Sequence, residues 1–179
     1  MRRRFLPLLL LTTLLGCSKS DSNPIVDFGE GEGITYRTSQ NIPYGPHDPT
    51  DWTSDGDWNQ RERALFADLN LDLNGAQRPD LAISDAAYPN PAAGAAIWGL
   101  SSRIAGSTTT YSVRALLVDR KYRPLLQLGP TTFSNGIRFS LNYRGAGLGS
   151  NELCRLYYVV YNTSGLVYKG HGDVRYSPQ

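Results

Sequence analysis

Apolar and polar residues alternate with the two-residue period of β-strands over most of the chain beyond residue 80. These stretches are rich in Val, Ile, Thr and Tyr, and turn-forming pairs such as Ser164-Gly165 separate them. Short strands at this spacing are typical of an antiparallel Ig-like β-sandwich. The predicted fold class is therefore mostly β, with expected strands at residues 81–87, 95–100, 109–119, 124–128, 136–143, 153–162, 165–170 and 173–176.

The segment before these strands has a less regular pattern. Prolines interrupt residues 34–56, so an irregular loop whose aromatic residues pack on the main body is expected there. A helical stripe, capped by Ser54 or Asp55, predicts one short helix over residues 55–67. Residues 69–73 alternate like a strand and end at a turn. We thus expect a loop-rich segment with a short helix at 34–80, packed on a sandwich domain at 81–179.

Residues 1–16 have the three parts of a secretory signal peptide. Arg2, Arg3 and Arg4 give a positive start, residues 5–15 are mainly apolar, and Gly16 is a small residue at the expected cut. A helix that crosses a bilayer needs about 20 apolar residues. The run is therefore too short for a membrane-spanning anchor and is expected to be removed by signal cleavage.

Leu14-Leu15-Gly16-Cys17 resembles the lipobox of bacterial lipoproteins. The resemblance implies cleavage before Cys17 and acylation of Cys17 with chains such as palmitate. Two or more acyl chains anchor a protein stably to a membrane. Ser18 follows the cysteine, and lipoproteins without aspartate at that position are usually sent to the outer membrane. The expected location is the outer membrane, on its periplasmic face or at the cell surface.

Charge and cysteine content narrow the function further. Residues 17–33 contain the lipidated Cys17 followed by polar, acidic and Gly-rich sequence, which predicts a flexible tether. Loss of the three signal arginines leaves 15 basic against 16 acidic side chains, a net charge of −1. No basic excess remains to bind phosphates, so nucleic-acid binding is excluded. Cys154 has no disulfide partner once Cys17 is acylated, and its apolar surroundings indicate a core residue.

A second resemblance begins at Tyr88, where the sequence reads Tyr-Pro-Asn-Pro-Ala-Ala-Gly. This phrase resembles the opening of the β-sandwich sorting domains found at the C-termini of type IX secretion cargo in gliding bacteria. Residues 113–128 are similar to the central hairpin of those domains. The resemblance covers residues 88–176, and it implies a sandwich of about seven strands and that bacterial group.

Candidate chemistry is concentrated in one acidic and aromatic stretch. Clustered carboxylates could bind a cation, or two of them could act as the acid and base of a glycosidase. The aromatic residues beside them could stack on sugar rings. Turn formation and helix capping explain aspartates there equally well. The residues concerned are Asp48, Asp51, Asp55 and Asp57 with Trp52 and Trp58.

Two further motifs imitate ligand sites. Residues 70–81 are spaced like a calcium loop, but Leu81 stands where a bidentate carboxylate is required, so a turn at Asn74-Gly75 competes with that interpretation. His171 precedes Asp173 by two residues, yet the sequence has no nucleophile elbow, which favours a histidine in a surface turn. The tyrosines of residues 157–176 are interpreted as cross-strand packing. No cofactor and no metal are expected.

These patterns favour a non-enzymatic, lipid-anchored envelope protein with a β-sandwich interaction module, bound to the membrane through its lipid and to an unidentified envelope protein or glycan. One alternative is a glycan- or peptide-binding surface module that uses the aromatics of residues 44–58 and requires Trp52 and Trp58 to be exposed and adjacent. The other alternative is a hydrolase that uses the Asp48–Asp57 cluster. It requires two carboxylates facing one cleft at about 5–10 Å.

Overall fold

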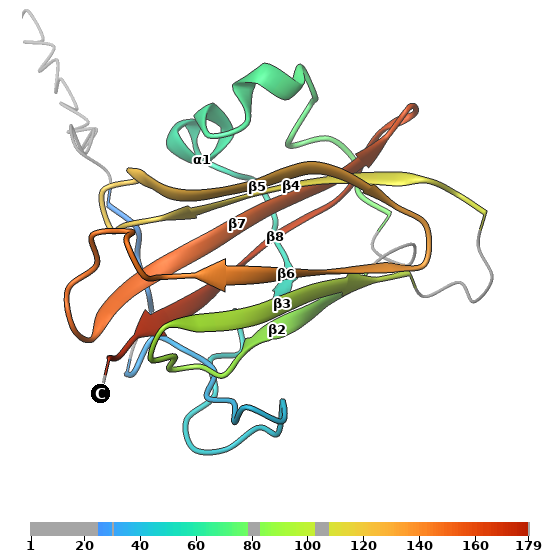
Figure 1. The fold of residues 1–179 in the computed structure, drawn as a ribbon. Helices are drawn as coiled ribbons and strands as arrows, with labels where there is room; N and C mark the ends of the chain where they lie inside the picture. The colour runs from blue at the N-terminus through green and yellow to red at the C-terminus, as the bar shows by residue number, and fades with distance from the viewer. Residues whose placement is uncertain (1–24, 30, 79–82, 103–107, 179) are drawn as a thin grey trace, which may run out of the picture.

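The computed structural model describes residues 25–29, 31–78, 83–102 and 108–178, so the signal segment, Cys17 and Asp80 lie outside the described residues. The described chain forms two antiparallel sheets and one short α-helix, which confirms the predicted β-sandwich class (Figure 1). Its elements are β1 (Thr53–Ser54), α1 (Gln60–Ala64), a 3-10 turn η1 (Ala67–Leu69), β2 (Ile83–Tyr88), β3 (Ala95–Ser101), β4 (Tyr111–Val118), β5 (Pro124–Phe133), β6 (Gly136–Asn142), β7 (Glu152–Asn162) and β8 (Gly165–Tyr176).

The larger sheet has the strand order β1-β8-β7-β4-β5, and the smaller sheet has the order β2-β3-β6. The main core lies between them. Trp98 of the small sheet packs against Tyr158 of the large sheet, with ring centroids 5.0 Å apart, and both residues are fully buried. Inward positions on β4 alternate as Val113, Ala115 and Leu117, each 0% exposed, as expected for a strand with one face toward this core.

A second apolar layer covers the outer face of the large sheet. Trp58 and Phe66 stack with their ring centroids 5.6 Å apart, and Trp58 meets Tyr157 of β7 edge to face at 5.5 Å. Both faces of β7 are therefore covered. This explains why residues 153–160 are apolar on both faces apart from Arg155, and it confirms β7 as a central strand between β4 and β8.

The predicted helix begins in the wrong place. Asn59, not Ser54 or Asp55, caps α1: its side chain accepts hydrogen bonds from the amides of Arg61 (2.7 Å) and Glu62 (3.1 Å), and the Glu62 carboxylate accepts one from the Asn59 amide (2.7 Å). This reciprocal pair is a capping box. The strand expected at 69–73 is also absent from the described chain, which has a turn at residues 72–75, so only the turn at Asn74-Gly75 was predicted correctly.

Two boundaries also move. The strands expected at 165–170 and 173–176 form one continuous strand, β8, and β5 extends to Phe133 instead of ending at 128. The folded body begins well before residue 34, because Val26 is 0% exposed, Phe28 is 6% exposed, and the Val26 amide donates to the carbonyl of Arg120 at 2.8 Å. The tether predicted to reach residue 33 is therefore wrong for Val26 and Phe28, whose apolar side chains fill the outer layer.

Candidate functional site

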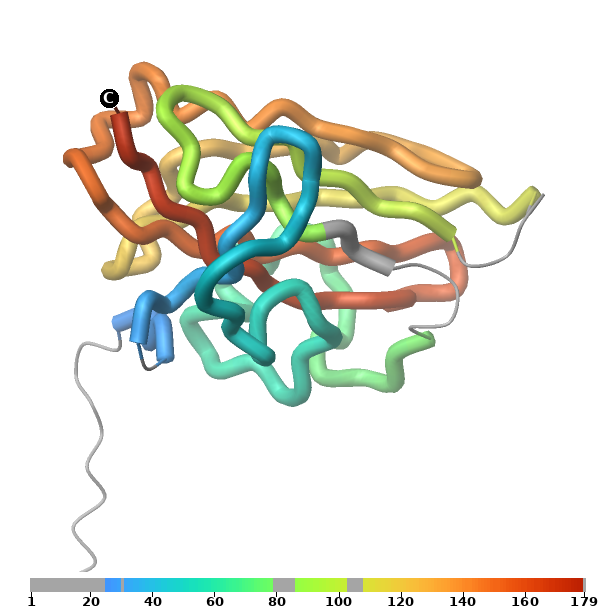
Figure 2. The backbone as a smooth tube through the Cα atoms, turned by 90° about the horizontal axis from the view of Figure 1, so that it is seen from below, coloured from blue at the N-terminus to red at the C-terminus, as the bar shows by residue number. Residues whose placement is uncertain are grey.

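The candidate site lies at the edge of the large sheet, where the segment of residues 31–58 crosses β8 (Figure 2). β1 pairs with β8 there, with Thr53 opposite His171. Gly172 is required at this crossing because an added Cβ would lie 2.3 Å from the indole ring of Trp52. Gly170 is required because its Cβ would lie 2.3 Å from the carbonyl oxygen of Thr53. Gly170 and Gly172, which flank His171, are thus close-approach positions inside a strand.

A stripe of polar side chains runs along β7 and β8 beneath this crossing. The guanidinium of Arg155 binds the carboxylate of Asp173, directly opposite on β8, through Nε (2.7 Å) and Nη2 (2.6 Å). Burial lowers the pKa of Arg155, but the bonds and charge of Asp173 outweigh burial and raise it. Burial raises the pKa of Asp173, and the bonds and charge of Arg155 oppose that change. Nη2 also donates to the carbonyl of Asp27 at 2.7 Å, which fastens the N-terminal segment to the sheet.

The side chain of Asp51 takes the place of a backbone partner for β8 and for the N-terminal segment. It is 4% exposed, and its two oxygens accept hydrogen bonds from the backbone amides of Asp173 and Thr35, each at 2.9 Å. Burial, and then the negative charge of Asp173, raise the pKa of Asp51 to about 7. The carboxyl group is therefore held in a site that disfavours its negative charge.

His171 lies in the middle of β8, so the predicted surface turn is wrong. Its Nδ1 lies 2.7 Å from Oδ1 of Asp55, and Oδ2 of Asp55 accepts a 2.6 Å hydrogen bond from Nε1 of Trp58. The other ring nitrogen, Nε2, is buried without a hydrogen-bond partner among the described residues. Asp55 is thus recruited by tertiary contacts instead of capping a helix.

Lys169 completes the stripe. It is 1% exposed, its ammonium donates to Oδ1 of Asn74 at 3.0 Å, and it lies 4.9 Å from the centroid of the Trp58 ring. Burial lowers the pKa of Lys169, while nearby carboxylates such as Asp55 oppose that change. A buried lysine in this setting holds the turn of residues 72–75 against β8.

A hollow of about 240 Å³ opens beside Asp51. Trp52 and Arg37 contribute to its lining, and the Trp52 Nε1 and Arg37 Nε atoms are buried without a hydrogen-bond partner among the described residues. The Arg37 Nη1 atom donates to the side-chain oxygen of Asn41 at 2.7 Å. Two residues that line the hollow thus each carry a buried N–H donor without a partner among the described residues. The remaining lining residues are Thr35, His47 and Ala86.

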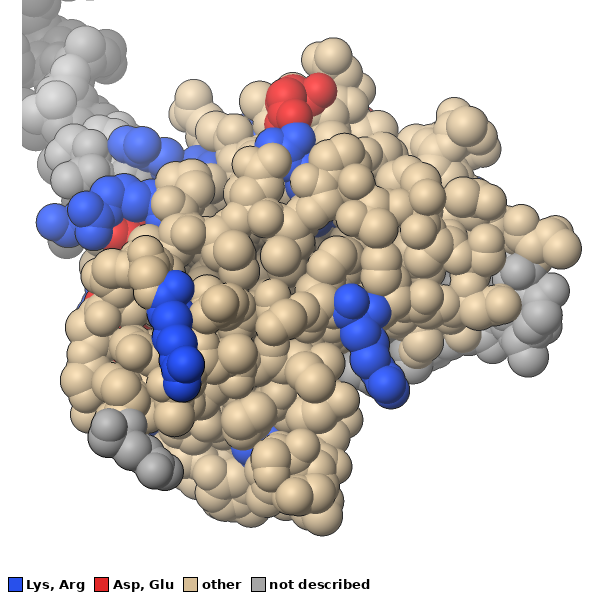
Figure 3. All heavy atoms as spheres, in the orientation of Figure 1, with Lys and Arg blue, Asp and Glu red and all other residues tan. Residues whose placement is uncertain are grey.

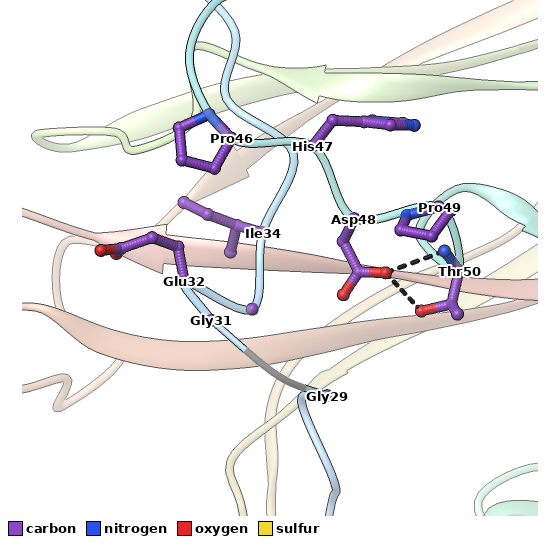
Figure 4. A pocket seen from close by; sticks show the side chains of 10 residues that line it. Gly29, Gly31, Glu32, Ile34, Pro46, His47, Asp48, Pro49 and Thr50 are labelled. Carbon is purple, nitrogen blue, oxygen red and sulfur yellow. Dashed lines mark hydrogen bonds between the residues drawn. The ribbon is translucent and has the colours of Figure 1, made fainter.

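A larger hollow of about 390 Å³ lies between residues 29–34 and 46–50 (Figure 4). Its two carboxylates do not converge: Figure 4 shows the side chains of Glu32 and Asp48 on opposite sides of the hollow. Glu32 is bonded to Arg175 at 2.7 Å, and Asp48 accepts hydrogen bonds from the amide (2.8 Å) and hydroxyl (2.7 Å) of Thr50. This hollow offers no convergent carboxylate pair.

The structure separates the residues that the glycan and hydrolase hypotheses grouped. Trp58 is 3% exposed, so it cannot present its ring beside Trp52, which is partly buried. Asp57 is exposed, whereas Asp55 is committed to Trp58 and His171. The requirement for two exposed, adjacent tryptophans is therefore not met.

Two other sequence interpretations have clear outcomes. Cys154 is 1% exposed, and burial raises the pKa of its thiol to about 12, which confirms the core role. Tyr157, Tyr158 and Tyr168 are buried in the large sheet, which confirms cross-strand packing. By contrast, Tyr44 of the proline-rich loop stays 48% exposed, although it contacts the ring of Tyr36.

The small sheet presents a face with few charges. In Figure 3 uncharged residues cover most of the surface over β3 and β6, and the Lys and Arg side chains stand apart from one another. Ile97 is 42% exposed there. The other exposed positions of these strands are Ala95, Gly136, Arg138, Ser140 and Asn142.

Comparison with known proteins gave no family model, no curated protein and no solved structure that matches this chain. Among the described residues, no helix has the length and apolar character needed to cross a membrane.

Proposed function

We propose that this chain is a lipid-anchored protein of the bacterial cell envelope whose β-sandwich acts as an interaction module and not as an enzyme. Its anchor is the acylated Cys17, which follows a signal-like segment at the lipobox position. The anchor holds the sandwich near the lipid: Ile25 is eight residue steps beyond Cys17, which is at most about 28 Å of extended chain. A partner is then a component of the envelope.

The observation that carries the non-enzymatic proposal is how the candidate carboxylates are used. Asp51 accepts two backbone amides, Asp55 bonds Trp58 and His171, and Asp48 bonds Thr50. Asp51 and Asp55 fasten the chain between residues 48 and 58 to Thr35 and β8, and Asp48 forms a local turn within that segment. Moreover, Asp48 and Asp51 line two different hollows. An acid–base pair of a glycosidase instead faces one cleft.

The charge-poor face over β3 and β6 supports an interaction role. Cores of protein–protein interfaces are depleted in charged residues. On this face Ile97 is exposed at the centre of β3, and Arg138 is the one charged residue among the exposed positions of the two strands. The small sheet is thus the best candidate for the surface that meets an envelope partner.

The anchor is tested by comparing the two cysteines of the chain. Cys17→Ser should abolish incorporation of labelled palmitate and release the protein from the membrane fraction. Cys154→Ser is the matched control and should leave both unchanged, because Cys154 is buried in the sandwich. If the Cys17→Ser protein remains palmitoylated and membrane-bound, the proposal fails.

Protease treatment of intact and lysed cells separates the two orientations of the domain. Cleavage in intact cells would place the sandwich at the cell surface. Protection in intact cells with cleavage after lysis would place it in the periplasm. A protein that is recovered in the cytosolic fraction would contradict the envelope proposal in either form.

A second candidate function, binding of a glycan or peptide, is favoured by one observation: Trp52 and Arg37, which line the hollow beside Asp51, each carry a buried N–H donor without a partner among the described residues. Sugar hydroxyls would accept from such donors. Trp52→Phe keeps a ring but removes Nε1, so it should weaken retention on a glycan array. Trp58→Phe is the control, since Trp58 lies outside the hollow. Equal retention by wild type and Trp52→Phe would dismiss this candidate.

A further inference from the structure

Three potential metal ligands meet where the 48–58 loop crosses β8. A carboxylate oxygen of Asp51, a carboxylate oxygen of Asp173 and a ring nitrogen of His171 all lie within 4.8 Å of one another. Asp51 and Asp173 are 4% and 0% exposed, so water does little to screen them. Buried carboxylates this close together are costly unless a positive charge balances them.

The histidine is oriented as a metal ligand usually is. Asp55 binds Nδ1, and Trp58 in turn holds the second oxygen of Asp55. A carboxylate on one ring nitrogen fixes the tautomer and leaves the other nitrogen for the metal. In this tautomer Nε2 carries a lone pair, and it is the nitrogen that has no hydrogen-bond partner among the described residues.

The carboxylates keep the capacity to bind a cation. A carboxylate has about four lone-pair sites on its two oxygens. Asp51 uses one site on each oxygen for a backbone amide, and Asp173 uses one on each for Arg155. Asp51, Asp55 and Asp173 together carry three negative charges when ionised, and Arg155 supplies one positive charge in direct contact. Lys169 supplies a second positive charge near Asp55, and a divalent cation would balance the negative charge that Asp51 and Asp173 still carry beyond Arg155.

We propose that Asp51, His171 and Asp173 form a binding site for a divalent transition metal of the zinc type, with Asp55 as the residue that orients His171. An imidazole nitrogen with two carboxylate oxygens suits Zn²⁺ better than Ca²⁺ or Mg²⁺, which prefer oxygen ligands alone. Of the three ligands, Asp51 also lines the hollow of about 240 Å³, and a metal would enter from that side. The metal would join the loop of residues 48–58 to β8. This proposed site departs from the sequence-based expectation of no metal. It does not depend on the proposed function.

The experiment uses the full chain in detergent, purified without a histidine tag and stripped with EDTA. Calorimetric titration with Zn²⁺ should give one site per chain, and Co²⁺ should give an absorption spectrum from the same site. His171→Asn should lose both signals, because the asparagine amide can keep the bond to Asp55 but has no group at the place of Nε2. His47→Asn is the matched control, since His47 is exposed and is the other histidine of the chain.

Asp55→Asn tests the geometry without removing a ligand. Loss of such an orienting carboxylate weakens metal affinity by about 10–100-fold, so this variant should still bind Zn²⁺, but less tightly. Near-ultraviolet circular dichroism shows whether His171→Asn folds. If it does not fold, the affinity of Asp55→Asn for Zn²⁺ tests the proposed site in its place.

Three results would overturn the proposal. One is a wild-type chain that binds no Zn²⁺ at about 1 mM, a concentration at which even weak sites fill; a proton or a water molecule would then occupy the space between the three groups. Another is an affinity that His47→Asn lowers and a folded His171→Asn does not. The third is an affinity that Asp55→Asn leaves unchanged.

Discussion

Asn90 offers the sharpest test of how this fold is held together. It lies between β2 and β3 and is 1% exposed. Its Nδ2 donates to the carbonyls of Thr35 (3.2 Å) and Asp173 (2.9 Å), and its Oδ1 accepts from the amide of Arg175 (3.0 Å). Asn90→Ala removes these three bonds and leaves the two backbone bonds with Arg37 in place. One side chain thus joins the N-terminal segment, the small sheet and β8.

The expected loss of stability follows from the number of bonds and their burial. A hydrogen bond contributes about 1 kcal/mol net, and a buried polar group left without a partner costs about 1–3 kcal/mol. Three orphaned backbone groups, partly rescued by water, give an expected loss of about 3–5 kcal/mol. For a chain of this length that corresponds to a fall in Tm of about 6–20 °C.

Urea unfolding followed by tryptophan fluorescence measures this loss. Asn142→Ala is the matched control, because Asn142 is exposed and its side chain accepts one bond, from the amide of Arg144 at 3.0 Å. The control should lose no more than about 1 kcal/mol. Asn90→Asp should be at least as damaging at neutral pH, because its carboxylate would face two carbonyl oxygens. The reasoning is refuted if Asn90→Ala costs no more than Asn142→Ala.

Three further predictions concern other parts of the sandwich. Gly172→Ala would place a methyl group 2.3 Å from the ring of Trp52, so it should displace that ring and change its fluorescence; an unchanged spectrum in a folded variant would count against this crossing. Cys154, with its thiol pKa raised to about 12, should react with a thiol reagent at pH 8 only in urea, and rapid native labelling would contradict its burial. Burial raises the pKa of Asp119, but bonds from Arg123 outweigh burial and lower it, so the stability advantage of wild type over Asp119→Asn should be present at neutral pH and fade as pH falls below about 4. An advantage that grows in acid would contradict this sign.

The strands could be predicted because their signals are local. Alternation and turn pairs such as Ser164-Gly165 act over a few residues, and β7 and β8 meet at that turn in the structure. The helix start was less accessible, because Asp55 and Asn59 are both good capping residues. Asp55 does not cap the helix, because its carboxylate contacts His171, a residue far along the chain. A sequence pattern carries no record of such a contact.

The polar stripe was missed for a related reason. Gly170 and Gly172 have the composition of a turn, and only the approach of Thr53 to Gly170 and of Trp52 to Gly172 shows why a strand needs them. Arg155, the one charged residue among the apolar residues 153–160, was the signal that a buried partner exists. Its partner is Asp173, but the pairing depends on the register of β7 against β8. Register is set by the whole sheet and not by either residue alone.

The buried polar groups have a common physical origin in the irregular cover of the large sheet. Residues 25–29 and 31–37 form no regular strand, yet several of them are buried and their backbone groups need partners. Side chains supply them: Arg155 donates to the carbonyl of Asp27, and Asp51 accepts from the amide of Thr35. These polar residues therefore substitute for a strand ladder. An apolar replacement at Arg155 would bury the same area but remove the hydrogen bond to the carbonyl of Asp27, so residues 25–29 would be the first segment to detach.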